Sequence, residues 1–241
     1  MIQTTRAIIL HTTKYSDNAT IVHTYTEEFG RISYIVNGRK GKKGGVAVAL
    51  TQPLSIVELL VEHQEKRHLQ RIKESRLAPL QPVAPLDMHK NALGFFIAEI
   101  LYRVLKESVQ DKPLFQFLQQ SICSLYIINK GVANFHLLFL LQLTRFMGIY
   151  PNLNNCAQAR YFDLVNGIFC NSAPTHSHVV QSNLCSYLET MLQLDYETMH
   201  QLRLNRGERN ALLEVLIEYY RLQSQEHFTL KSPDVLKTLF D

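Results

Sequence analysis

The sequence predicts an α+β protein with two domains, in which a small five-stranded β-barrel precedes an all-α helical domain. Three observations lead to this prediction. Short β-branched segments separated by turn residues fill the first 76 residues, and three prolines fall within residues 79–85. From residue 87 onward, apolar residues recur with the period of a helix. With 241 residues, the chain is long enough to bury a sizeable core.

The N-terminal domain is expected to span residues 1–78 and to hold five strands. Ile8, Ile9 and Leu10 lie at the centre of the first, over residues 6–13. The other strands are predicted at residues 19–26, 31–36, 54–61 and 67–76. Short strands at this spacing, with a basic loop after the third, are compatible with an OB-type barrel.

A proline-rich linker is expected at residues 79–86, and the helical domain at 87–241. Asp87 is a suitable N-cap for the first helix, and Gly148 suits the C′ position that ends the third. The helices are predicted at residues 87–106, 112–128, 131–147, 182–194 and 206–224. Residues 149–181 between them are irregular.

The stretch 30–45 combines glycines with cations and has no acid nearby, since none occurs between Glu28 and Glu58. Such a loop can approach phosphates closely and neutralise them. Tyr34, on the strand that enters the loop, is a candidate for stacking a base, although a core position explains it equally well. The predicted DNA-binding residues are Arg31, Tyr34, Arg39, Lys40, Lys42 and Lys43, with Arg67 and Arg71 on a neighbouring strand.

The positive charge belongs to the N-terminal third of the chain. Residues 1–80 hold twelve of the 25 Lys and Arg residues but only seven of the 21 Asp and Glu residues. This asymmetry points to a polyanionic partner for that domain. A solvated hairpin loop without a ligand is the competing interpretation.

Several classes of protein are disfavoured. The chain has no nucleophile elbow, Walker A loop, dinucleotide fingerprint or His-Glu-x-x-His motif, so we expect no enzymatic activity and no cofactor. It has no apolar run long enough for a membrane span and no signal-peptide layout at Met1. Four cysteines without a secretion signal predict no disulfides and a cytoplasmic protein.

Residues 149–181 resemble a degenerate metal site. Cys156 and Cys170 each begin a knuckle-like turn, with a predicted hairpin at 161–169 between them. A four-cysteine zinc site would need a second cysteine in each turn, but Ala159 and Ala173 stand there. We therefore expect a zinc-finger-like hairpin without metal; a mixed site completed by histidines is the less favoured alternative.

Several motifs in series resemble bacterial RecO, the family of recombination mediator and annealing proteins of DNA repair. They run in the family's order over essentially the whole chain. The motifs are Ala7-Ile-Ile-Leu10, Thr26-Glu-Glu-Phe-Gly-Arg31, Gly38-Arg-Lys40 with its basic loop, Gln52-Pro-Leu-Ser-Ile-Val-Glu58, Gly148-Ile-Tyr-Pro-Asn-Leu-Asn-Asn-Cys156 and Lys231-Ser-Pro-Asp-Val-Leu236.

The resemblance implies an N-terminal OB-fold and a helical C-terminal domain with an inserted zinc finger. It also implies binding of single- and double-stranded DNA, strand annealing and action at the nucleoid. The implied protein partners are RecR and the acidic, phenylalanine-ended tail of single-stranded-DNA-binding protein. Ala159 and Ala173 depart from the zinc-bearing members, so no metal is expected here.

Three other functions compete with this interpretation. A basic OB-type domain also suits an RNA- or ribosome-associated factor. A purely structural interaction module would need no nucleic acid, and a zinc-dependent enzyme is the least favoured because ligands and a general base are missing.

Overall fold

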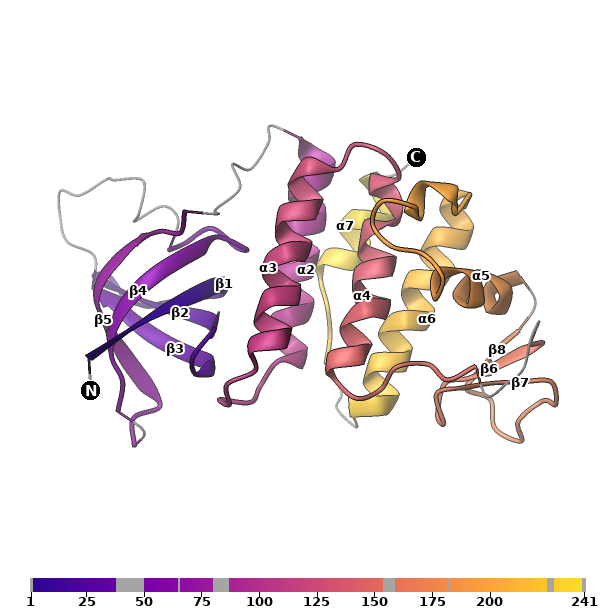
Figure 1. The fold of residues 1–241 in the computed structure, drawn as a ribbon, viewed down its shortest axis with the longest axis horizontal. Helices are drawn as coiled ribbons and strands as arrows, with labels where there is room; N and C mark the ends of the chain where they lie inside the picture. The colour runs from indigo at the N-terminus through magenta and orange to yellow at the C-terminus, as the bar shows by residue number, and fades with distance from the viewer. Residues whose placement is uncertain are drawn as a thin grey trace. The chain divides into compact units, whose positions relative to one another are not determined.

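The computed structural model describes residues 2–37, 50–64, 66–79, 87–153, 159–181, 183–224 and 228–239. Its contacts group the chain into two compact units, Met1–Tyr126 and Ile127–Asp241 (Figure 1). Most of the segment predicted as a linker lies outside the described residues, so a domain boundary at residues 79–86 remains a prediction.

The first unit contains a closed five-stranded barrel, which confirms the predicted OB-type architecture. Its strands follow the order β1-β2-β3-β5-β4 (Figure 1). Neighbours pair antiparallel except β3 and β5, which run parallel. The strands are β1 (Ile2–Ser16), β2 (Ala19–Thr26), β3 (Gly30–Asn37), β4 (Ile56–Glu62) and β5 (Leu69–Leu77).

Alternation along the strands fills the barrel. Residues of one parity point inward and form a buried apolar cluster. The cluster comprises Ala7, Ile9, Val22, Ile32, Tyr34, Leu50, Val57, Leu59 and Val61. Ile8 points the other way and is still fully buried, which explains the continuous apolar run in β1: a strand covered on both faces carries no polar alternation.

The covering comes from two helices of the same unit, α2 (Met88–Val104) and α3 (Lys112–Ile127). α2 contacts β1, and Asp87 caps it as predicted, accepting hydrogen bonds from the N–H groups of His89 and Lys90 at 2.9 and 3.2 Å. Arg6 of β1 reaches α3, donating to Gln119 at 3.0 Å while its guanidinium lies over the Phe115 ring. These helices are therefore part of the unit that contains the barrel.

The connection between α2 and α3 lies against the start of β3. The Arg31 N–H donates to the Glu107 carbonyl at 3.0 Å, and the Ser108 hydroxyl donates to the Arg31 carbonyl at 2.7 Å. Gly30 has a φ of +61°, and a Cβ at this position would lie 2.3 Å from the Val109 carbonyl oxygen. Only glycine permits this approach without strain.

The second unit is built around α4 (Phe135–Phe146), most of whose side chains are buried. Gly148, with a φ of +70°, follows the end of α4 as predicted. The other helical elements are η1 (Val132–Asn134), α5 (Asn183–Met191), η2 (Met199–Gln201), α6 (Arg206–Ser224) and α7 (Ser232–Leu239). The sequence analysis did not predict α7. No helix among the described residues is long and apolar enough to cross a membrane.

The predicted hairpin is present as two of the three strands in a small sheet. β6 (Tyr161–Asp163) pairs with both β7 (Ile168–Cys170) and β8 (Val179–Gln181). Asp163 accepts from the N–H groups of Val165 and Asn166 and so forms the turn between β6 and β7. The rings of Phe162 and Phe169 lie 4.6 Å apart, so aromatic packing stabilises the hairpin.

Candidate nucleic-acid interface

The strand order of the barrel defines one face on which OB-folds bind oligonucleotides, the outer surface of β2 and β3 with the loops beside it. The register places outward side chains in two rows across four strands. One row is His11, His23, Ser33 and Leu69; the next is Thr13, Ile21, Ile35 and Arg71. The second row ends in an exposed cation, as a surface that contacts phosphates would require.

Arg67 and Arg71 are both exposed, and the structure explains how they are held. Arg71 lies on β5 opposite Ile35 of β3. Arg67 lies in the turn between β4 and β5, which the buried amide of Gln70 fixes. The Gln70 amide N–H₂ donates to the carbonyls of Gln64 and Arg67 at 2.7 and 2.6 Å, and its oxygen accepts from the Gln64 N–H at 3.1 Å.

Other cations nearby are partly neutralised. Lys73 pairs with Glu62 at 3.1 Å, and Arg76 pairs with Glu58. The Lys73 hydrogen bond is also the main cause of the lowered pKa of Glu62. Lys66 and Arg67 at the turn, together with Arg71, are therefore the exposed cations of β5 and of the turn before it that have no ion pair to a described carboxylate.

Two other predicted residues, Tyr34 and Arg31, are buried or half-buried. Tyr34 points into the barrel core and is 0% exposed, so a base cannot stack on it while the barrel is closed. Its position supports the core alternative, so Tyr34 is not part of the interface. Arg31 is half-buried, with its guanidinium carbon 4.4 Å from the centroid of the Tyr102 ring. Arg39, Lys40, Lys42 and Lys43 lie outside the described residues.

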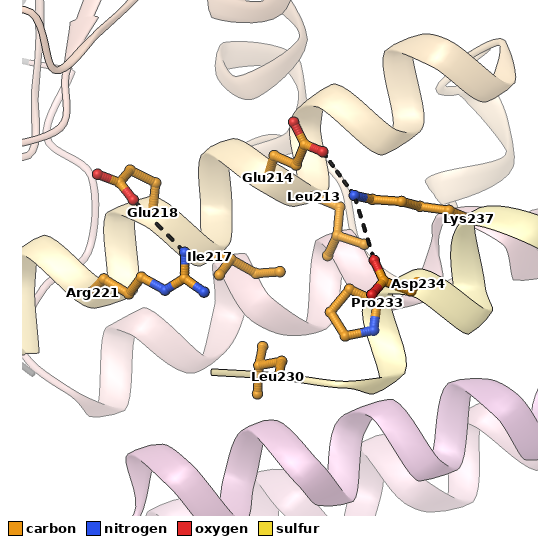
Figure 2. Close-up of a pocket in the computed structure, with 9 residues that line it drawn as sticks. All are labelled: Leu213, Glu214, Ile217, Glu218, Arg221, Leu230, Pro233, Asp234 and Lys237. Carbon is orange, nitrogen blue, oxygen red and sulfur yellow. Dashed lines mark hydrogen bonds and ion pairs between the residues drawn. The ribbon is translucent and has the colours of Figure 1, made fainter. Parts of the chain in front are cut away.

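A second candidate site is a pocket of about 410 Å³ in the second unit, between α6 and α7 (Figure 2). Its lining combines four apolar side chains with five charged ones: Leu213, Ile217, Leu230, Pro233, Glu214, Glu218, Arg221, Asp234 and Lys237. Lys237 lies 2.8 Å from Glu214 and 4.0 Å from Asp234, and Arg221 lies 4.0 Å from Glu218. The hydrogen bond to Glu214 is the main cause of the raised pKa of Lys237.

The predicted metal positions are only partly described. Cys156 lies outside the described residues. The Cys170 thiol donates to the Ser172 carbonyl at 3.3 Å, and buried Ala159 accepts from the Cys185 thiol through its carbonyl. Ala173 is exposed.

The two histidines of this segment contact carboxylates. His176 lies 3.2 Å from Asp163, and His178 lies 3.4 Å from Glu218. Among the residues that the structure describes, no group of three His, Cys, Asp or Glu side chains is arranged to hold a metal ion.

Sequence reasoning missed the aromatic residues of the barrel face. His11 and His23 are neighbours across β1 and β2, and Tyr102 of α2 lies 4.7 and 5.1 Å from their rings. The contact of these histidines with a helix some 80–90 residues later leaves no local signal in the sequence.

The fold defines the class of protein: a five-stranded OB barrel followed in the chain by a helical C-terminal part. Two family models match the chain, "Recombination protein O N terminal" over residues 1–81 and "Recombination protein O C terminal" over residues 85–232. The chain therefore belongs to the RecO family, as the resemblance indicated.

Curated relatives match along the full length. The proteins named DNA repair protein RecO from Bacteroides fragilis and Phocaeicola vulgatus are 42% and 38% identical over 243 and 240 residues. That from Porphyromonas gingivalis is 36% identical over 245 residues. In each case the match covers 100% of this chain and 100% of the relative.

Proposed function

We propose that this protein is a non-enzymatic mediator of DNA repair and homologous recombination. It binds single- and double-stranded DNA, anneals complementary strands and helps to load the recombinase together with RecR. It acts in the cytoplasm, at the nucleoid. The observation that carries the proposal is the OB barrel of a RecO-family chain with exposed Arg67 and Arg71 beside its β2–β3 face.

The chemistry of annealing fits such a surface. Two complementary strands repel each other through their phosphates, and a protein that holds both must supply cations without reading bases. The cations of the β4–β5 turn project from an ordered backbone because Gln70 fixes that turn. They therefore contact phosphates at a small cost in backbone entropy.

The test combines oligonucleotide binding with strand annealing over a salt series. The double variant Arg67→Ala, Arg71→Ala is compared with Lys130→Ala, Arg203→Ala, which removes two exposed cations from the second unit. Loss of two phosphate contacts should make the plot of log K against log salt shallower by about 1.4 for single strands. Annealing should slow in parallel, and the control should match the wild type.

Three outcomes would refute parts of the proposal. A wild-type protein that neither binds nor anneals DNA would refute the mediator function. Normal binding by the Arg67, Arg71 variant would refute this interface. Preference for RNA oligonucleotides over DNA of the same sequence would favour the RNA-associated alternative. A variant with Arg39, Lys40, Lys42 and Lys43 changed to alanine tests the predicted basic loop in the same assay.

We further propose that the α6–α7 pocket accepts the acidic, phenylalanine-ended tail of single-stranded-DNA-binding protein. Leu213, Ile217 and Leu230 supply an apolar lining for the ring, and Lys237 and Arg221 supply cations for the carboxylates (Figure 2). Because Lys237 already pairs with Glu214, the tail must displace that partner, which predicts modest affinity.

Binding of a synthetic tail peptide, measured by calorimetry, tests this assignment. Lys237→Ala should weaken binding, and Glu214→Gln should strengthen it by freeing the lysine and removing a repelling charge. Lys130→Ala is the matched control. Equal affinity of wild type and Lys237→Ala would contradict the placement, and RecR pull-down by both proteins would separate the tail site from the RecR surface.

A further inference from the structure

The outer face of the barrel and helix α2 together carry a group of rings and guanidinium groups that the proposed interface does not use. This group, the Tyr102 cluster, consists of His11, His23, Arg31, Tyr102 and Arg103. The two imidazoles are stacked with centroids 5.9 Å apart, and Tyr102 lies against both. The guanidinium carbons of Arg31 and Arg103 lie 4.4 and 5.6 Å from the centroid of the tyrosine ring.

The arginines of this cluster have unsatisfied donors. Arg31 Nη1 and Arg103 Nε are buried and have no hydrogen-bond acceptor among the described residues. Buried donors normally have partners, because an unpaired N–H loses its hydration without compensation. Tyr102 is the group that favours the charged form of Arg31, and burial lowers the pKa of that arginine to about 10. An anion would stabilise both guanidinium groups.

The positive charge of the arginines also lowers the pKa values of the two histidines. Burial, followed by the charge of Arg31, lowers the pKa of His23 to about 4. The pKa of His11 is lowered by partial burial and then by the charges of Arg103 and Arg31, whereas the charge of Glu99 raises it. The histidines are therefore neutral near pH 7, and the guanidinium groups set the positive potential of the cluster.

The cluster is accessible and adjoins the proposed DNA path. His11 is exposed, and Tyr102 and Arg103 are half-buried. His11 and His23 occupy the row of outward residues directly beside the row that ends in Arg71. A strand whose phosphates contact Arg71 can continue across this face to the Tyr102 cluster.

We propose that the Tyr102 cluster binds a backbone phosphate of a nucleic-acid strand, with Arg103 and Arg31 as the anion ligands and exposed His11 as the ring on which the neighbouring base stacks. This inference rests on the proposed DNA-binding function and extends it to a second set of residues. The cluster combines cations with an aromatic surface, as single-strand binding sites do.

The experiment measures binding of fluorescein-labelled 20-nucleotide oligothymidylate by anisotropy across a sodium chloride series. The variants are Arg103→Ala, Arg103→Lys and His11→Asp. Arg145→Ala is the control, because the Arg145 guanidinium lies 4.4 Å from the centroid of Tyr150 in the second unit and so loses the same charge and the same kind of contact. Unfolding temperatures of all variants establish that each is folded.

Loss of one phosphate contact should make the salt dependence of Arg103→Ala shallower by about 0.7 and weaken binding about five-fold at 0.1 M salt. Arg103→Lys should recover most of this loss, since it keeps the charge. His11→Asp should weaken binding further by repelling the phosphate, and Arg145→Ala should behave as wild type.

Wild-type salt dependence in Arg103→Ala would overturn the site while leaving the proposed function intact. Arg103→Lys as weak as Arg103→Ala would assign Arg103 a packing role instead. Absence of binding by the wild type would refute both the function and the inference. At constant ionic strength, inorganic phosphate should displace the oligonucleotide more readily from wild type than from Arg103→Ala. If phosphate bound to wild type but not to Arg103→Ala and displaced no oligonucleotide, the site would be one for free phosphate, and the strand assignment would be wrong.

Discussion

Replacing Tyr34 by phenylalanine removes one buried oxygen from the barrel and leaves its packing unchanged. The side chain is 0% exposed, and its hydroxyl has no hydrogen-bond partner among the described residues. Burial of an unpaired hydroxyl costs about 1–3 kcal/mol. We therefore expect Tyr34→Phe to raise the free energy of unfolding by about that amount. Tyr34→Ala should lower it by about 3–5 kcal/mol, because it empties the centre of the core.

Urea unfolding followed by circular dichroism measures these changes, with a constant m value as the sign that the folded state is unaltered. Oligonucleotide binding by Tyr34→Leu adds a second readout. A core residue should leave affinity unchanged, whereas a stacking residue would cost about 1–3 kcal/mol per base. A loss of stability in Tyr34→Phe, or weaker DNA binding by a folded Tyr34→Leu protein, would show that Tyr34 is not a pure core residue.

Three further predictions follow from the described contacts. In thermal unfolding, Gly30→Ala should destabilise the protein more than Gly148→Ala does. Both glycines have a positive φ, but of the two only Gly30 would bring a Cβ against backbone atoms. Equal effects of the two substitutions would contradict this. Burial, with a smaller effect of Arg209, lowers the pKa of His136 to about 3. The contribution of neutral His136 to the free energy of unfolding should therefore be complete above pH 6.5. It should fall by up to about 1.4 kcal/mol per pH unit as the pH drops toward 3. Urea unfolding across this pH range should show that slope in the wild type and not in His136→Leu. Gln70→Ala should lower stability by about 1–3 kcal/mol and speed amide exchange at Arg67, and unchanged exchange would show that Gln70 does not hold the turn.

Local sequence signals predicted much of the fold. The strands of the barrel, the Asp87 cap and the Gly148 helix end all depend on residues within a few positions of one another. Helix α7 was missed because its eight residues, Ser232–Leu239, are too few to establish a helical period.

The orientation of β3 could not be predicted from its sequence. Alternate residues of β3 lie on opposite sides of the strand: Ile32, Tyr34 and Val36 on one side, and Arg31, Ser33 and Ile35 on the other. Alternation shows which residues share a face, but both sides carry apolar residues, and only pairing with other strands decides which side enters the core. Tyr34 therefore had two equally good interpretations before the structure was known.

In the candidate site too, the sequence predicted some of the residues, and only the tertiary structure revealed the others. Exposed cations such as Arg67 and Arg71 were found from the charge pattern. By contrast, Arg31 and Tyr102 are 71 positions apart in the sequence and meet because α2 packs on β1. Contacts of this kind depend on tertiary structure, so neither the Tyr102 cluster nor the α6–α7 pocket could be derived from composition or spacing.

Hydrogen exchange of the full protein, measured with and without a single-stranded oligonucleotide, locates the DNA-binding surface. Bound DNA should slow exchange in β2, β3, the turn between β4 and β5 and the C-terminal turn of α2. Exchange in α4 and α6 should remain unchanged. Protection confined to residues 127–241, with none in the barrel, would contradict the assignment of the DNA-binding surface.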